Sequence, residues 1–145
     1  MKLLSKFLIL PLSEKFLLIK AVILVFIIRI ILFIFPIKII SSYINHIIKK
    51  TKKFNKVNPP IKNRIIWAIE VACNFIPGTK TCLIKSITGQ ILLAHYGYES
   101  NLCIGVAKNT ENKNNLQAHA WLESNGKVIL GEHEAEHYKP LLEIN

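Results

Sequence analysis

Aspartate is absent from the sequence, and all nine acidic residues are glutamates. Any catalytic or metal-binding carboxylate must therefore be a glutamate. Only three cysteines occur, an odd number without CxxC spacing, which argues against a disulfide framework and a zinc ribbon and favours a reducing, cytoplasmic location. The sequence has no P-loop, GxGxxG motif or basic–aromatic platform, so we expect no cofactor and no nucleic-acid partner.

Charged residues are also scarce, at 19% of the chain, whereas apolar residues make up 51%. This composition excludes a disordered chain, and 145 residues allow one compact unit and little else. The net charge of +10 is unevenly distributed. Residues 1–66 hold 13 Lys and Arg and a single acid, Glu14, for a charge of +12, whereas residues 67–145 carry −2. The basic half of the chain is therefore also its most apolar half.

The segment from Phe16 to Ile40 is almost continuously apolar, with Arg29 inside it. A bilayer span needs about 20 mostly apolar residues, and a charge at a helix centre costs about 2.5–3.5 kcal/mol on insertion scales. The segment also starts too late and runs too long for a signal peptide. Three interpretations stay open: a buried helix of a small helical subdomain, an interfacial helix flanked by lysines, or a tilted span. Residues 16–40 are thus a candidate contact with a membrane surface.

Prolines mark the expected element boundaries in this first part. Pro11 followed by Ser13 indicates the start of a helix, and Pro36 is expected to end or kink it. A second helix is predicted over 37–48, and the lysine-rich stretch from Lys49 to Pro60 is the natural linker. We therefore expect a helical, basic N-terminal region over 1–58 and a second domain over 59–145.

After the linker the hydrophobic period changes along the chain. Helical spacing predicts helices over 61–75 and 81–95, the second stopped by Gly97. Alternating patterns then predict three strands, with Asn125-Gly126 as a two-residue hairpin turn between the last two. These strands cover 102–106, 117–123 and 127–130. The order indicates an α+β domain whose helices pack against an antiparallel sheet.

Cys82 lies at the first turn of the second of these helices, just after Thr79 and Thr81, either of which can serve as N-cap. A thiol there faces the positive end of the helix dipole and unsatisfied backbone amides, a setting that favours a thiolate nucleophile. The alternative is a small buried residue. We adopt that alternative for Cys73 and Cys103, which fall mid-helix and mid-strand.

His119 is a candidate base because it lies mid-strand on a face shared with Trp121, where a polar ring is unusual. It is also compatible with a satisfied core histidine or an exposed strand residue. The hairpin turn favours the functional interpretation, because its register places Leu122 opposite Ile129 and His119 opposite Glu132. A carboxylate is then within reach of the imidazole.

Together, Cys82, His119 and Glu132 supply a nucleophile, a base and an orienting acid. The assignment of Glu132 depends on the turn. A one-residue bulge would move it away from the histidine, and Glu134 or Asn125 would then compete for the role.

Several short motifs, in this order and spacing, resemble those of a known family. They are Thr81-Cys82-Leu83, Gly97, Ile104-Gly105-Val106, Ala118-His119-Ala120-Trp121-Leu122-Glu123, Asn125-Gly126 and Leu130-Gly131. The chain resembles the transglutaminase-like cysteine protease of lasso-peptide biosynthesis, the B-type leader peptidase in its stand-alone, microcin-processing form. The resemblance extends upstream to Leu10–Lys15, the hydrophobic helix with Arg29, and Arg64–Ile69, so it covers nearly the whole chain.

This resemblance implies a cysteine helix packed on an antiparallel sheet, as in transglutaminase-like and papain-like domains, with Cys82 as nucleophile and His119 as base. The third member in the family is usually an aspartate, so here Glu132 substitutes or the site works as a dyad. The implied function is removal of the leader from a ribosomally made precursor peptide. The implied partners are that precursor, a small leader-recognition protein and an asparagine-synthetase-like lasso cyclase.

A competing motif, His133-Glu134-Ala135-Glu136-His137, matches the HExxH pattern of zinc proteases. Gly131 precedes it, Pro140 follows, and no apolar helical face recurs, so we expect no metal site. A solvated acidic tail is the preferred interpretation, with Tyr138, Leu141 and Leu142 packing on the domain. Three other functions stay open: a non-catalytic scaffold, a small membrane protein, and a transglutaminase or amidase acyl transferase.

Overall fold

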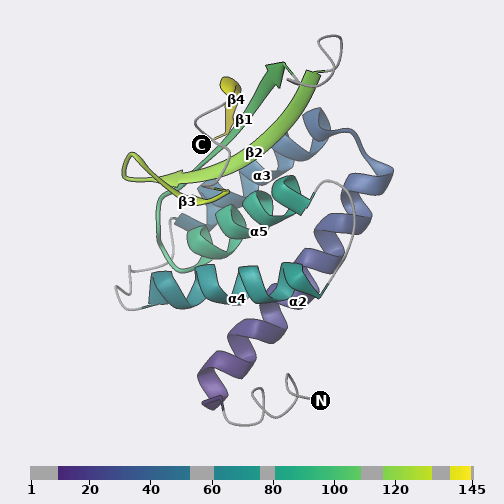
Figure 1. The fold of residues 1–145 in the computed structure, drawn as a ribbon. Helices are drawn as coiled ribbons and strands as arrows, with labels where there is room; N and C mark the ends of the chain where they lie inside the picture. Colours follow the sequence, from purple (N-terminus) through teal and green to yellow (C-terminus); the bar gives the residue numbers. More distant parts are fainter. Residues whose placement is uncertain (1–9, 53–60, 76–80, 109–115, 132–137, 145) are drawn as a thin grey trace.

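The computed structural model describes residues 10–52, 61–75, 81–108, 116–131 and 138–144 (Figure 1). Four helices precede four strands in the described part of the chain. The helices are α2 (Leu12–Ile34), α3 (Ile37–Lys52), α4 (Lys62–Asn74) and α5 (Thr81–His95), and the strands are β1 (Asn101–Lys108), β2 (Leu116–Ser124), β3 (Lys127–Leu130) and β4 (Lys139–Ile144). The predicted α+β class is confirmed.

Proline and glycine set the helix boundaries where the sequence indicates. Pro11 is the N-cap of α2, and its carbonyl accepts hydrogen bonds from the amides of Glu14 and Lys15. Pro36 separates α2 from α3, because a proline cannot continue the hydrogen-bond ladder of the preceding helix. Gly97 follows α5 with φ +82°, the left-handed conformation that commonly ends helices.

The lysine-rich stretch after Ile48 was predicted to be a linker, and its first part is helical instead. Helix α3 continues through Lys52. Lysine is a good helix former and no proline or glycine interrupts Lys49 to Lys52, so the helix has no local reason to stop. The expected division at residue 58 falls outside the described residues.

The strands form one antiparallel sheet in the order β3-β2-β1-β4. Asn125 and Gly126 join β2 to β3 with φ values of +54° and +72°, as the hairpin signal predicts. The register departs from the prediction one step later. Ser124 pairs with Lys127 as expected, but a bulge between Leu122 and Glu123 places Leu122 opposite Leu130 rather than Ile129.

Strand β4 is a correction to the predicted acidic tail. It pairs with β1 on the side away from β2, and Ile144 buries its side chain in the core. Leu141, expected to pack on the domain, is 69% exposed. Pro140 is compatible with this strand because β4 is at the edge of the sheet.

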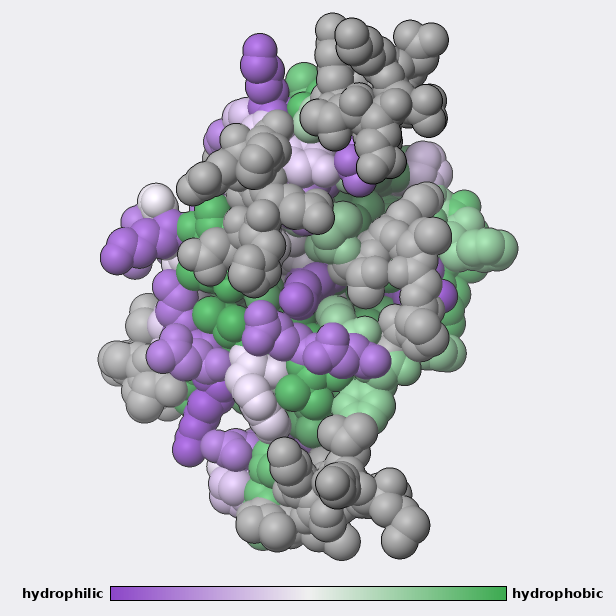
Figure 2. Space-filling model, in the orientation of Figure 1, coloured by the Kyte–Doolittle hydropathy of each residue, from purple (hydrophilic) through white to green (hydrophobic). Residues whose placement is uncertain are grey.

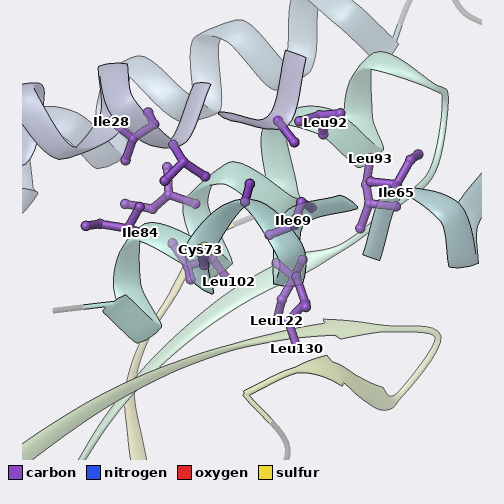
Figure 3. Packing of buried hydrophobic residues seen from close by; sticks show 14 of the residues in the cluster. Ile28, Ile65, Ile69, Cys73, Ile84, Leu92, Leu93, Leu102, Leu122 and Leu130 are labelled. Carbon is purple, nitrogen blue, oxygen red and sulfur yellow. The ribbon is translucent and has the colours of Figure 1, made fainter. Parts of the chain in front are cut away.

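Helix α5 occupies the centre of the fold. It contacts β1, β2 and β3 as well as the other three helices, with the sheet on one side and α4 and α2 on the other (Figure 1). Gly89 allows α5 to approach the sheet closely, since a Cβ there would lie 2.6 Å from Leu130 Cδ1 and 2.9 Å from Leu122 Cδ2. Side chains from α2, α4, α5 and the strands form one core, and Figure 3 labels Ile28, Ile69, Leu93 and Leu122 among them.

Candidate active site

Cys82 is the second residue of α5, and its side chain is partly buried. The first backbone N–H groups of a helix have no partner within the helix, and they carry the positive end of its dipole. The structure therefore places this thiol at the helix start, as predicted from the sequence.

His119 lies in β2 directly opposite Gly105 of β1. Its Nε2 is 3.2 Å from the carbonyl oxygen of Gly131, and a carbonyl can only accept, so Nε2 must donate in this hydrogen bond. The imidazole also lies near two aromatic rings, with ring centroids 5.0 Å from Tyr138 and 6.3 Å from Trp121. The orientation of the ring is thus fixed by three neighbours.

The motif around His119 has a structural explanation in the alternation of a strand. His119, Trp121 and Glu123 follow one another at every second position and so share one face of β2. Trp121 Nε1 donates to Glu123 Oε1 at 2.7 Å, which holds the indole ring that stacks beside the histidine. Gly105 is required on the neighbouring strand, because a Cβ there would lie 2.9 Å from the Trp121 ring and 2.7 Å from the Lys139 carbonyl oxygen.

Cys82 and His119 are both among the residues that line one cavity of about 370 Å³. The other lining residues are apolar and come from two sources. Leu83, Ile104, Ala118 and Ala120 belong to α5 and the sheet, and Leu32, Phe35, Pro36 and Ile37 belong to the corner between α2 and α3. Nothing in the sequence assigned the N-terminal helices to the site. No local pattern could have done so, because the corner reaches the cavity only through tertiary packing.

Glu132, the predicted orienting acid, lies outside the described residues. The register from which it was inferred is wrong at Leu122, which pairs with Leu130 rather than with Ile129. In the described part of the site, the Gly131 carbonyl contacts His119 Nε2. Sequence reasoning missed this group because it belongs to the backbone. The sequence shows only that residue 131 is a glycine, which has φ +83° in the structure.

The other two cysteines are structural, as predicted. Burial raises the pKa of the Cys73 thiol, and Lys85 opposes this only in part. For Cys103, 2% exposed, burial and then the carboxylates of Glu123 and Glu143 raise the pKa to about 11. Both side chains are therefore held as neutral thiols near neutral pH.

The residues that the structure describes contain no group of three or more His, Cys, Asp or Glu side chains that could hold a metal ion. The HExxH-like stretch over 133–137 lies outside the described residues, so its predicted lack of metal binding stays a prediction.

Comparison with known families agrees with this geometry. A model of the transglutaminase-like superfamily matches residues 48–143, about two thirds of the chain. The chain therefore belongs to the transglutaminase-like superfamily, whose members are usually cysteine-dependent enzymes. The match runs from the end of α3 into β4 and includes Cys82 and His119. No curated protein and no solved structure matches the chain significantly.

Proposed function

We propose that the protein is a cysteine peptidase that removes the leader from a ribosomally made lasso-peptide precursor. The observation that carries the proposal is the cavity shared by Cys82, at a helix N-terminus, and His119. Membership of a superfamily of cysteine-dependent enzymes supports it. The precursor peptide is the substrate. A small leader-recognition protein and an asparagine-synthetase-like cyclase are proposed as partners, by the resemblance of the motifs.

The hydrogen bond to Gly131 supports Nδ1 as the nitrogen of His119 that acts as base. With its proton on Nε2, a neutral imidazole carries its lone pair on Nδ1. Nδ1 takes the proton of the Cys82 thiol, and the thiolate attacks the carbonyl carbon of the scissile peptide bond. The Gly131 carbonyl then contacts the donor side of the imidazolium, in the orienting role that a carboxylate fills in many such sites.

Collapse of the tetrahedral intermediate breaks the C–N bond, and the imidazolium of His119 protonates the departing amine. The acyl group stays on Cys82 Sγ as a thioester. A water molecule, deprotonated by His119, hydrolyses the thioester and restores the thiol. The backbone N–H of Cys82, in the first turn of α5, is the donor we propose for the developing oxyanion.

The test compares wild type with Cys82→Ala, His119→Ala and the matched control Cys103→Ala. Each protein is incubated with a candidate precursor and its recognition protein, and cleavage is followed by mass spectrometry. We expect Cys82→Ala to lower the cleavage rate by about 10³-fold or more and His119→Ala by about 10²–10⁴-fold, with Cys103→Ala close to wild type. Unchanged cleavage by Cys82→Ala would contradict the proposal and favour a scaffold.

Glu132→Ala separates a triad from a dyad oriented by the backbone. If the Gly131 carbonyl suffices, this variant keeps most of the activity. A loss as large as that of His119→Ala would assign the third role to Glu132. Adding a primary amine to the reaction separates hydrolysis from acyl transfer, because a transferase yields the amide product in place of the free acid.

A further inference from the structure

Helix α2 carries an apolar stripe on the surface that the fold leaves uncovered. The stripe consists of Phe16, Ile19, Ile23, Phe26, Ile30 and Phe33, which recur at three- and four-residue intervals and are between 45% and 93% exposed. Ile27 and Ile34 widen it, and Lys20 and Arg29 are charged neighbours of the stripe. Figure 2 shows hydrophobic surface gathered where α2 turns into α3. A contiguous patch of this kind marks a contact with a protein or a membrane.

The opposite face of α2 is part of the protein core, which decides how the helix can meet a bilayer. The helix is long and apolar enough to cross a membrane, with a mean hydropathy of 3.0 over 18 residues. However, Ala21, Val25 and Ile28 on its inner face are at most 4% exposed, and α2 packs on α4 and α5. Crossing the bilayer would remove these side chains from the core. The helix can keep its packing only by lying along a surface.

The charges around the stripe favour an anionic surface over a second copy of the chain. Residues 1–66 carry a net charge of +12, which disfavours an association of two copies through this half of the chain. Their single acid, Glu14, is paired with Arg64 of α4 at 3.2 Å. Exposed lysines follow the stripe on α3, at positions 38, 49 and 50. Basic residues beside an apolar helix face are the pattern that anionic lipid headgroups attract.

A groove beside the stripe fits the same occupant. It has a volume of about 310 Å³ between α2 and α5, and Ile23, Ile27 and Ile91 are among the residues that line it, together with Lys20. The acyl chain of a phospholipid would pack against these isoleucines, while the phosphate of the same lipid approaches Lys20. The stripe is also wider than the narrow seam of a two-helix contact, because pairs of adjacent residues such as Phe33 and Ile34 are exposed together.

We propose that the apolar stripe docks the protein on an anionic phospholipid surface, with α2 lying in the plane of one leaflet. Phe26 and Phe33 enter the acyl region, and the lysines of α3 contact the headgroups. Phe35, half exposed at the end of α2, also lines the cavity that holds Cys82 and His119. The docked face therefore ends at the candidate active site. This inference does not depend on the reaction catalysed there.

Flotation of the full chain with phospholipid vesicles tests the proposal. We expect binding to vesicles that contain phosphatidylglycerol to exceed binding to pure phosphatidylcholine at least about tenfold, and added salt to reduce the difference. The double variant Phe26→Gln/Phe33→Gln should lose binding by a similar factor. Leu141→Gln, which changes an exposed leucine on β4, is the matched control and should bind as wild type does. Circular dichroism verifies that both variants are folded.

Several outcomes would overturn the proposal. These are wild-type protein that stays free of both vesicle types, or equal binding by wild type and the double variant. Resistance of the bound protein to alkaline carbonate would establish a spanning helix instead. A dimer that the double variant dissociates, without vesicle binding, would assign the stripe to a second copy. Cys82→Ala should bind vesicles as wild type does. The vesicle-binding result therefore tests the docking proposal even if the catalytic proposal fails.

Discussion

The first two helices and the remainder of the molecule use apolar residues differently. Of the 16 large hydrophobic side chains exposed in the described part of the chain, 13 lie between Leu12 and Ile47. Among the same described residues, the buried polar ones lie instead between Ser86 and Ser124. Among them, Gln90 donates from Nε2 to the carbonyls of Ile144, at 2.6 Å, and Ser100, at 3.3 Å. One region thus leaves many large hydrophobic side chains exposed, and in the other Gln90 links α5 to β4 and to Ser100 through buried hydrogen bonds.

The largest expected effect tests the two faces of α2 with matched substitutions. Ile28→Ala removes a side chain that is 4% exposed and should lower the free energy of unfolding by about 2–5 kcal/mol. Ile30→Ala changes a side chain that is 46% exposed and should cost about 0.5 kcal/mol or less. Urea denaturation followed by circular dichroism measures both. Equal losses of unfolding free energy in the two variants would show that the stripe packs inside the fold, which would contradict the difference between the two faces of α2.

The second prediction concerns the tight packing of the sheet. Gly105→Ala would place a Cβ 2.7 Å from the Lys139 carbonyl oxygen, so β4 must move away from β1. We expect a loss of about 1–3 kcal/mol in unfolding free energy. Ala107→Val, on the same strand at a less buried position, provides the control and should cost less. If Gly105→Ala left the free energy of unfolding unchanged, the sheet would tolerate substitution as well as the exposed side of α2 does.

The third prediction separates the fold from the site within the second region. Gly131 and Gly126 have φ values of +83° and +72°, so alanine at either position costs about 1–2 kcal/mol in backbone strain. Only at Gly131 would the new Cβ meet neighbours, 3.0 Å from the Ala120 carbonyl oxygen and 3.1 Å from Trp121 Cβ. Gly131→Ala should therefore also lower kcat by displacing the carbonyl that holds His119. If Gly126→Ala lowers kcat equally, the Gly131 carbonyl has no orienting role.

The smallest effect is a dependence of stability on alkaline pH, located in the sheet. The pKa of Cys103 is raised from 9.0 to about 11 in the folded state, so the fold binds its proton more tightly than the unfolded chain does. This contribution is complete below pH 9.0 and is lost as the pH rises towards about 11. We expect a decline on the order of 1 kcal/mol over that range. In Cys103→Ala the decline should be shallower, whereas Phe33→Ala on α2 should leave the slope unchanged.

Much of the fold follows from local signals. Prolines 11 and 36 and glycine 97 set helix ends, and Asn125-Gly126 sets the hairpin, because each acts through its own backbone conformation. Strand β4 was missed because Lys139–Ile144 shows no clear alternation and includes a proline, and its pairing with β1 joins segments far apart in the sequence. The bulge at Leu122 also has no local signature.

The candidate site divides in the same way. Cys82 and His119 were predicted because their chemistry is unusual for their local positions, at a helix start and within a strand. The cavity that they share needed the packing of α5 on the sheet, and its apolar wall needed the corner at Phe35. Whether Glu132 contributes could not be predicted, because it depended on a register that one extra residue changes.

The α2–α3 corner forms one wall of the cavity, and this limits how far the chain can be shortened from its N-terminal side. The superfamily match begins at residue 48, after that corner. A shortened chain starting at α4 would keep Cys82, His119 and the whole sheet, yet it would lack Leu32 and Phe35 and would expose the faces of α4 and α5 that α2 covers. The part of the sequence that the family model matches is therefore smaller than the unit that builds the core and lines the cavity.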